Sequence, residues 1–382
     1  MERVEKLLKE RKAKGLLRRL EPLSKRGRGR IRLQERDYLD FSSNDYLGLT
    51  NHPRLIEAAV KATQAWGTGS SASRLLSGDL NIHHDLESKV AAFKGKEAAL
   101  VFNSGYQANV GIISAIVGRG DAIFSDRLNH ASIIDGALLS GAKLFRYRHN
   151  DVNHLESLLK RERDKFKGVL ILTESVFSMD GDRAPLKEIA LLKERFGSLL
   201  MVDEAHATGI FGASGAGMVE EEGMIDKVDL IMGTFSKALG SFGGYIACDR
   251  RIKEYLVNFS RSFIYSTALP PSVIAVNSAS IDLIKEEPFR RDRLIENSIY
   301  FRKGLVGRGF CVRGDSEIVP VILGGALRAV NLSKALQESG YHVLPIRPPT
   351  VPTGESRLRF SLNFDHTKEI LDRVIDAIVG GI

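Results

Sequence analysis

Residues 199–206 read LLMVDEAH, a short apolar run that ends abruptly in two carboxylates and a histidine. A similar apolar run, 169–173, lies upstream of it, and another, 230–232, lies downstream. Helix-like segments separate the three runs, and a weaker apolar run follows at 245–247. Apolar strands that alternate with helices are typical of a mainly parallel sheet that helices cover on both faces. The sequence therefore predicts an α/β fold around this sheet.

Polar residues follow each of the three main apolar runs. Glu174 comes directly after the first run, and Asp203 ends the second. The third run leads into the segment 234–237, which begins with Thr234 and ends with Lys237. In open α/β sheets the ligand binds beyond the carboxyl ends of the strands. The three polar strand ends therefore predict one common site.

Outward from this sheet, changes of pattern divide the chain into three parts. Residues 1–45 carry a helix and an arm, residues 46–272 form a large domain around the sheet, and residues 273–382 form a smaller α+β domain. The helical patterns cover residues 2–20, 53–66, 83–94, 105–117, 273–287, 289–307 and 367–380, and strand-like pieces cover 31–41, 317–323 and 357–362.

The composition is that of an ordinary globular protein, with 43% hydrophobic and 27% charged residues in 382. No uninterrupted apolar run approaches the roughly 18 residues that a membrane span requires. The basic N-terminus lacks the apolar segment of a secretory signal. Two cysteines, Cys248 and Cys311, are too few for a disulfide framework. We therefore expect a cytoplasmic protein without a membrane partner.

The net charge of +8 is concentrated near the N-terminus, where residues 1–36 hold 14 Lys and Arg against 5 Asp and Glu. Such an arm can attract nucleic acid, an acidic surface or phosphorylated small molecules, and it can equally be a solvated helix. No aromatic residue is interleaved with these charges, and the chain has no motif that reads nucleic acid. We expect no nucleic-acid partner.

The segment 234–240, TFSKALG, places Lys237 just beyond a buried strand. Desolvation there lowers the pKa of a lysine and exposes a nucleophilic amine, although a solvated lysine is commoner in this position. Asp203 at the previous strand end can pair with a protonated ring nitrogen, and His206 can hydrogen-bond a cofactor oxygen or Asp203. The sequence DEAH also occurs in helicases, but these need a phosphate-binding loop, and Gly95-Lys96 continues with Glu97.

Three further features bear on the site. His130, in the segment 129–132 (NHAS), offers a flat ring that can stack on a cofactor, although a lone histidine is more often structural. The segment 104–106 (SGY) opens a helix, whose free amides bind phosphate in some proteins and need only an ordinary cap in others. The pair His83-His84 lacks a metal-ligand partner, and no nucleophile elbow is present, so we expect neither a metal site nor a serine hydrolase.

Taken together, the motifs resemble those of the α-oxoamine synthases, fold-type I pyridoxal-phosphate (PLP) enzymes that join an amino acid to an acyl thioester. The resemblance runs from about residue 15 to the C-terminus. The motifs that carry it are residues 41–48 (FSSNDYLG), 129–132 (NHAS), 177–182 (FSMDGD), 203–206 (DEAH) and 234–237 (TFSK).

This resemblance implies a role for each matching residue. Lys237 holds PLP as a Schiff base and moves protons, Asp203 pairs with the pyridinium, and His130 stacks on the ring. His206 and Ser178 contact the region of the ring oxygen. Thr267 reaches the phosphate of the cofactor in the other subunit of an obligate homodimer. The remaining positions are Ser104, Gly105, Tyr106 and Thr234 in the cofactor cradle, Asn44 and Arg359 (with Arg357 as runner-up) at the amino-acid carboxylate, and Arg18 and Thr350 at the acyl substrate.

Within the family, residues 346–352 (IRPPTVP) and 357–359 (RLR) favour the branch of biotin synthesis. That branch condenses L-alanine with a pimeloyl thioester of coenzyme A or of acyl carrier protein. Residues 70–73 (SSAS) depart from the more glycine-rich loop common in this branch, which leaves the acyl preference open. The alternatives are a glycine acetyltransferase, another enzyme of the family, or a silent partner subunit. The last of these conflicts with the presence of Lys237, Asp203 and His130.

Overall fold

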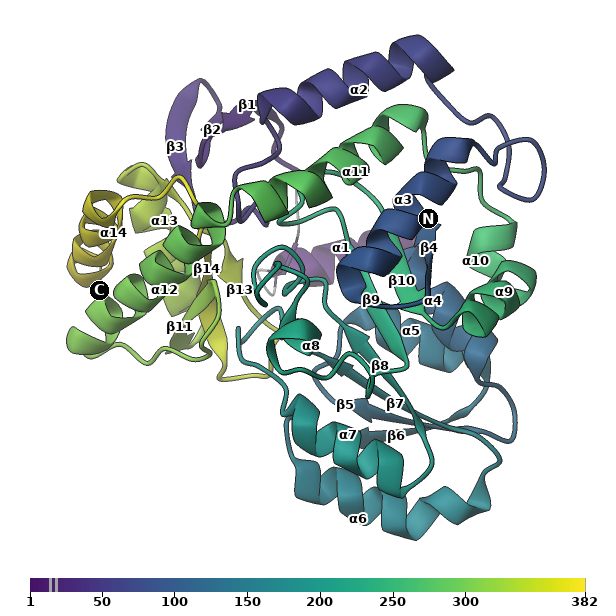
Figure 1. The fold of residues 1–382 in the computed structure, drawn as a ribbon. Coiled ribbons are helices and arrows are strands. Elements are labelled where there is room, and N and C mark those ends of the chain that lie inside the picture. The colour runs from purple at the N-terminus through teal and green to yellow at the C-terminus, as the bar shows by residue number, and fades with distance from the viewer. Residues whose placement is uncertain (14–15, 18–19, 382) are drawn as a thin grey trace.

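The computed structural model describes residues 1–13, 16–17 and 20–381. Its centre is a seven-stranded sheet in the order β4-β10-β9-β8-β7-β5-β6 (Figure 1). β10 runs antiparallel to both of its neighbours, and the other pairs are parallel. The predicted α/β fold is thus confirmed. The strands are β4 (Ala98–Phe102), β5 (Ala122–Asp126), β6 (Lys143–Tyr147), β7 (Val169–Glu174), β8 (Leu199–Asp203), β9 (Leu230–Thr234) and β10 (Gly244–Cys248).

Alternate residues of the central strands face two different cores. In β7, Val169 and Ile171 belong to one hydrophobic cluster, whereas Leu170 and Leu172 belong to the other. Both faces are therefore buried, as a continuous apolar strand requires. One face packs against α3 (Asn81–Lys94), α6 (Val152–Glu162) and α7 (Leu186–Arg195), and the other packs against α4 (Gly105–Ile116), α5 (Ala131–Ser140) and α9 (Arg250–Phe259).

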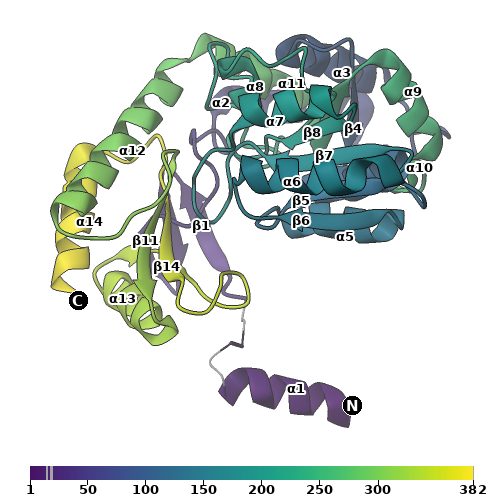
Figure 2. The same ribbon diagram turned by 90° about the horizontal axis from the view of Figure 1, so that it is seen from below.

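A second layered unit follows the central sheet (Figure 2). Its three-stranded sheet has the order β11-β14-β13, and residues of three helices are buried in the cluster that covers it. The strands are β11 (Ile318–Gly324), β13 (Pro345–Ile346) and β14 (Ser356–Ser361), and the helices are α12 (Phe289–Gly307), α13 (Ala326–Glu338) and α14 (Lys368–Gly380). The helix α11 (Pro271–Glu286) leads from the large unit into it.

The N-terminal segment differs in part from the sequence prediction. α1 (Glu2–Ala13) has no buried residue, and residues 16, 17 and 20 are not helical, so the helix is shorter than the predicted span 2–20; without a buried face, a helix of this length gains little stability from packing (Figure 2). The strand-like pattern at 31–41 corresponds to β2 (Arg30–Leu33) and β3 (Arg36–Asp40), which form an antiparallel hairpin, and β1 (Leu23–Gly27) extends it into a meander. β3 pairs with the distant strand β12 (Tyr341–His342). The domain boundaries at residues 45 and 272 stay a prediction.

The remaining elements are short or peripheral. They are α2 (Pro53–Trp66), the 3-10 turn η1 (Arg163–Lys165), α8 (Met218–Glu221) and α10 (Arg261–Ile264). In the described part of the chain, no helix has both the length and the apolar character needed to cross a membrane.

Candidate active site

The carboxyl ends of the central strands bring the predicted residues together. Glu174 and Asp203 are the last residues of β7 and β8 and lie opposite each other in the parallel ladder. Lys237 follows β9, the next strand of the sheet. Its Nζ lies 2.8 Å from Nε2 of His206, which follows β8. The expected juxtaposition at the strand ends is therefore present.

Asp203 lies almost fully buried beneath this group and receives two N–H donors. The Nδ2 of Asn109, in α4, donates to Oδ2 at 2.8 Å, and the backbone N–H of Ala205 donates to Oδ1 at 2.9 Å. Among the described residues no cation forms a salt bridge with Asp203. Its carboxylate is thus oriented by neutral donors and is available to a positively charged group of a ligand.

The surroundings of Lys237 and Glu174 shift the pKa values of both side chains. Burial lowers the pKa of the Lys237 amine to about 8, against the opposing pull of Asp203 and Glu174. Burial, followed by the nearby charge of Asp203, raises the pKa of Glu174 well above its usual range. Glu174 also accepts a hydrogen bond from the backbone N–H of His130. The site thus holds an amine that is partly neutral near neutral pH, as a nucleophilic lysine requires.

The two histidines differ in their surroundings. His130 caps α5, and its Nδ1 accepts a hydrogen bond from the N–H of Ser132 and lies 2.7 Å from that residue's Oγ. The same Oγ accepts a hydrogen bond from Asn109, at 2.9 Å. These contacts fix Nδ1 as an acceptor and orient the ring. Burial lowers the pKa of His130, although Asp203 opposes the shift.

His206 is buried and contacts residues other than Asp203. Its Nδ1 lies 2.8 Å from the hydroxyl of Tyr46, and its Nε2 faces Lys237. Burial, followed by the charge of Lys237, lowers the pKa of His206 well below its usual value. A neutral imidazole here can exchange a hydrogen bond with the amine of Lys237. Of the two contacts that the sequence left open for His206, Asp203 is not among its hydrogen-bond partners in the described structure, and the contact with a cofactor oxygen stays a prediction.

The start of α4 carries residues that the sequence assigns to a phosphate cradle, a role that stays a prediction. Ser104 caps the helix by accepting a hydrogen bond from the N–H of Gln107, at 3.2 Å. Gly105 lies so close to β9 that a Cβ on it would stand 3.0 Å from Cε of Met232 and 3.6 Å from Cβ of Thr234. Helix N-termini of this kind bind anions through their free amides. Thr234 and Gly105 therefore face the same small space.

Tyr106 and Thr267 lie at the outer side of this helix start. The Tyr106 ring is half exposed, and its hydroxyl bonds to Asp135 of α5. Thr267 is exposed, and its carbonyl accepts a hydrogen bond from Nδ2 of Asn103, at 2.8 Å. This contact holds Thr267 beside the start of α4, at the surface of the single chain. Its expected role toward a partner subunit stays a prediction.

The structure distinguishes Arg359 from Arg357, although both project from the same face of β14. Arg357 is buried and pairs with Asp180 at 2.6 Å and Glu355 at 3.1 Å. Arg359 contacts neutral groups instead: Oδ1 of Asn44 at 3.3 Å, the hydroxyl of Tyr46 at 3.2 Å, Oγ of Ser361 and the carbonyl of Ser178. No carboxylate of the described residues pairs with it. Arg359 and Asn44 thus lie in contact, and their role at a substrate carboxylate stays a prediction.

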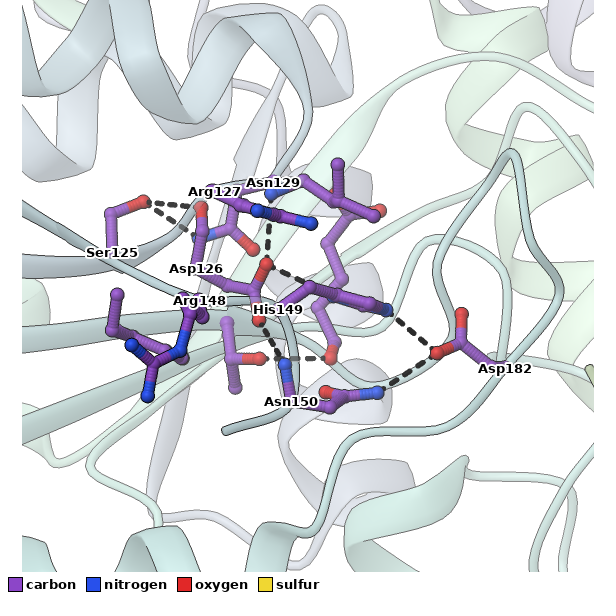
Figure 3. A network of polar contacts seen from close by, with 12 residues as sticks. Ser125, Asp126, Arg127, Asn129, Arg148, His149, Asn150 and Asp182 are labelled. Carbon is purple, nitrogen blue, oxygen red and sulfur yellow. Dashed lines mark hydrogen bonds and ion pairs between the residues drawn. The ribbon is translucent and has the colours of Figure 1, made fainter. Parts of the chain in front are cut away.

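Ser178 belongs to a loop, residues 177–182, which a charged network fixes to the large sheet. His149 lies between two carboxylates, with Nδ1 3.0 Å from Asp126 and Nε2 2.7 Å from Asp182 (Figure 3). Although burial opposes it, hydrogen bonds to Asp126 and Asp182 raise the pKa of His149 to about 9. Asn150 adds hydrogen bonds of 2.9 Å to each of the same two carboxylates. The loop is therefore clamped by a protonated imidazole.

Two predicted acyl contacts have different outcomes. Thr350 is exposed and lies at the wall of a cavity of about 740 Å³ that Met179 of the 177–182 loop also lines. Arg18 lies outside the described residues. Its match to acyl-substrate contacts therefore stays a prediction.

Sequence reasoning missed three residues of this site. Tyr46 links His206 to Arg359, and Asn109 links Asp203 to Ser132. Glu317 is fully buried, and neither carboxylate oxygen has a hydrogen-bond partner in the described structure. Burial raises the pKa of Glu317 to about 7, against the nearby charge of Arg359. An asparagine within the apolar helix pattern 105–117 was the signal that could have identified Asn109.

Comparison with known proteins identifies the family. A family model described as aminotransferase class I and II matches residues 36–378. The chain belongs to this family. Its similarity to the class I and II aminotransferases extends over nearly the whole chain, and the cofactor of the family is PLP. The resemblance to the α-oxoamine synthases is confirmed by the relatives that follow.

One relative of this aminotransferase-family chain is a protein of Geotalea daltonii named 8-amino-7-oxononanoate synthase. It is 52% identical over 370 residues, which cover 96% of this chain and 94% of the relative. A solved 8-amino-7-oxononanoate synthase from Francisella tularensis is 30% identical, with a TM-score of 0.79 over 90% of this chain and 97% of that one. A serine palmitoyltransferase structure with PLP is 32% identical, with a TM-score of 0.94 over 100% and 97% of the two chains.

The residues of this chain fit PLP. Asp203 presents a buried carboxylate that no cation of the described residues neutralises, which suits a protonated pyridine nitrogen. The amine of Lys237 has the lowered pKa that covalent attachment requires. Gly105 leaves a space beside Thr234 that a Cβ would narrow. Asp203 ends β8, Lys237 follows the neighbouring strand β9, and Gly105 at the start of α4 lies against β9, so the three features surround one space at the strand ends.

Proposed function

We propose that this chain condenses L-alanine with a pimeloyl thioester of coenzyme A or acyl carrier protein. The products are 8-amino-7-oxononanoate, carbon dioxide and the free thiol, in biotin biosynthesis. The observation that carries the proposal is a line of contacts from Lys237 through His206 and Tyr46 to Arg359. These contacts connect the reactive amine of Lys237 to the guanidinium of Arg359, which has no acidic partner among the described residues. The amino group of an α-amino acid would react near the first, and its carboxylate would bind the second. The names of the relatives support this reaction over the alternatives.

PLP, when bound, supplies an electron sink that stabilises negative charge at the α-carbon of the amino acid. Asp203 keeps that sink effective by facing the ring nitrogen with a negative charge. Lys237 then takes the α-proton on Nζ, because a pKa of about 8 leaves part of the amine neutral near neutral pH. His206, 2.8 Å from Nζ, holds the amine in place between these steps. His130 covers the ring with an imidazole that Ser132 fixes.

Arg359 and Asn44 hold the substrate carboxylate in this proposal. The two N–H-bearing ends of the guanidinium share Oδ1 of Asn44 at 3.3 Å, a weak contact that a carboxylate can replace. The carbonyl of Ser178 and the hydroxyl of Tyr46 keep the plane of the guanidinium fixed. Ser178 would contact the region of the ring oxygen when PLP is bound, and its loop is held by the ion pair between His149 and Asp182.

The acyl donor enters along basic surface in this proposal. The arm of residues 1–36 carries nine more positive than negative charges and can attract the phosphates of coenzyme A or an acidic carrier protein. Neutralising several arm charges should raise the KM for the acyl donor and reduce its salt dependence. Unchanged values would remove the arm from the proposal and leave the reaction untouched.

A homodimer with shared sites completes the proposal. Thr267 is exposed beside the start of α4 and forms an isolated β-bridge with Ser73. Two large apolar side chains are exposed close to this bridge in sequence: Tyr265 near Thr267, and Leu76 near Ser73. An apolar surface of this kind is typical of a subunit interface. Size-exclusion chromatography with light scattering should give twice the mass of the chain, about 84 kDa from a 42.2 kDa subunit. A monomer that turns over at full rate would refute the shared site.

Product identification tests the reaction directly. The purified enzyme is given alanine or glycine with pimeloyl- or acetyl-coenzyme A, and products are identified by mass spectrometry. The proposal expects 8-amino-7-oxononanoate from alanine and the pimeloyl donor as the fastest combination. Faster reaction of glycine with acetyl-coenzyme A would identify a glycine acetyltransferase instead. A colourless protein that no borohydride treatment alters would indicate a silent partner subunit.

A further inference from the structure

The cavity of about 740 Å³ beside the 177–182 loop has a wall that suits an alkyl chain. Leu128 lines it from the large domain, and Phe177 and Met179 line it from the loop. Val351 and Pro352 close it from the small domain, next to Thr350. The site described above has no other use for this apolar surface. A chain of methylene groups can be desolvated here without leaving a polar group unpaired.

The cavity also holds several charged side chains, and all but one of its cations are neutralised. Arg313 pairs with Glu355 at 2.6 Å and Asp180 at 3.2 Å. His149 pairs with Asp182, and Arg357 pairs with Asp180. Arg127 lines the same cavity, is exposed, and has no acidic or hydrogen-bonding partner for its guanidinium within the described residues. Arg127 is therefore the cation of the described cavity lining that can pair with an incoming anion without losing an acidic partner.

Two short segments connect this cavity to the reactive site. Arg127 and Leu128 directly precede Asn129 and His130, so the strand end that presents the imidazole also presents the free cation. On the other side, Met179 follows Ser178, whose carbonyl accepts a hydrogen bond from Arg359. The cavity thus begins within one or two residues of groups that the proposed reaction uses.

We propose that Arg127 binds the free carboxylate at the far end of the acyl donor. This assignment rests on the proposed function, because only a donor with a distal acid can use it. The methylene groups of the donor lie along the apolar wall, and the carboxylate forms a charge-assisted hydrogen bond with the guanidinium. Arg127 is in this way a specificity-determining residue, which favours an ω-carboxyacyl thioester over a plain fatty-acyl thioester.

The test compares two donors of equal chain length, pimeloyl-coenzyme A and heptanoyl-coenzyme A, with alanine and the PLP-loaded enzyme. R127A should lower kcat/KM for the pimeloyl donor about 10- to 100-fold, the worth of one hydrogen bond to a charged group. It should change kcat/KM for the heptanoyl donor little, because that donor ends in a methyl group. R127K should keep part of the preference, since it retains the charge but loses the planar fork.

Arg148 provides the matched control. Its side chain is exposed and pairs with Asp151 at 2.7 Å, on the same edge of the sheet but outside the cavity lining, so R148A should leave both donors unchanged. Equal losses with both donors in R127A would overturn the assignment and point to a contact with the phosphates of coenzyme A. Unchanged pimeloyl activity in R127A would also overturn it. If the wild type makes no 8-amino-7-oxononanoate, the proposed function fails independently of Arg127.

Discussion

A buried ion pair beneath the active site gives the most quantitative prediction. Nζ of Lys94, in α3, lies 2.7 Å from Oε2 of Glu204 and 3.0 Å from Oγ1 of Thr208, and it also bonds to the carbonyl of Ala216. Both charged side chains are fully buried. Burial alone would lower the pKa of Lys94, but the charge of Glu204 prevails and raises it. Lys94 is therefore protonated at neutral pH.

Lys94→Met should cost about 3–5 kcal/mol of unfolding free energy, the usual price of leaving a buried charge without its partner. In this variant Glu204 keeps one N–H donor, from Val219 at 2.8 Å, but no cation. With a urea slope of roughly 3 kcal/mol per molar, the unfolding midpoint should fall by about 1–2 M. Adding Glu204→Gln should recover much of the loss, because the amide oxygen can still accept from Val219 and the buried charge is gone.

Lys89 serves as the control on the same helix. It pairs with Asp282 at 2.7 Å, but the two side chains are 31% and 42% exposed, so Lys89→Met should cost less than about 1 kcal/mol. Unfolding is followed by fluorescence in urea at a fixed excess of PLP, which holds the contribution of ligand binding constant. The reasoning is refuted if Lys94→Met costs no more than Lys89→Met, or if Glu204→Gln adds a further full loss instead of recovering stability.

Three other predictions concern the site itself. Lys237→Ala should abolish turnover while alanine and PLP still bind, as difference absorbance spectra would show; measurable turnover would contradict its role as base. Arg359→Lys should raise the KM for alanine about 10- to 100-fold, because a lysine cannot form the two parallel hydrogen bonds, and steady-state kinetics would detect an unchanged KM as a failure. His149 has a folded-state pKa raised to about 9, so its stabilisation is complete below pH 6.5 and is lost as the pH rises through 9. The unfolding free energy of the wild type should therefore fall by about 2–3 kcal/mol more than that of His149→Asn between pH 6.5 and 9.5 in urea titrations, and parallel curves would refute the clamp.

Four strands of the central sheet, β7 to β10, could be predicted from sequence, whereas β4 and β5 were not predicted, although every residue of both is buried. The runs that became β7, β8 and β9 were found within one or two residues of their bounds. β6 was missed because it is the edge strand, and only one of its five residues is buried. β12 has two residues, and its partner β3 lies some 300 positions earlier in the chain, so no local pattern could reveal it.

The site was predictable where a residue's role depends on its position at a strand end. Asp203 and Lys237 lie where the alternation of strands and helices placed them. Tyr46 and Asn109 were missed because their roles arise from contacts with residues far along the chain. Tyr46 meets Arg359 across 313 positions, and Asn109 meets Asp203 across 94. Such contacts depend on tertiary packing, which no periodicity in the sequence encodes.

Partner charge, and not residue type or burial, separates the structural arginines of this region from those that we propose to bind a substrate. Arg357 and Arg359 lie two residues apart on one face of β14, and their exposed fractions are 1% and 8%. Arg357 is neutralised by Asp180 and Glu355 and holds the 177–182 loop, whereas Arg359 meets only neutral oxygens. A guanidinium that is orientated but not neutralised retains most of its attraction for an incoming carboxylate. In the adjoining cavity, the same criterion distinguishes Arg127 from the cations that acidic residues neutralise. The lack of an acidic partner among the described residues thus supports both proposed carboxylate contacts, that of Arg359 with the amino acid and that of Arg127 with the acyl donor.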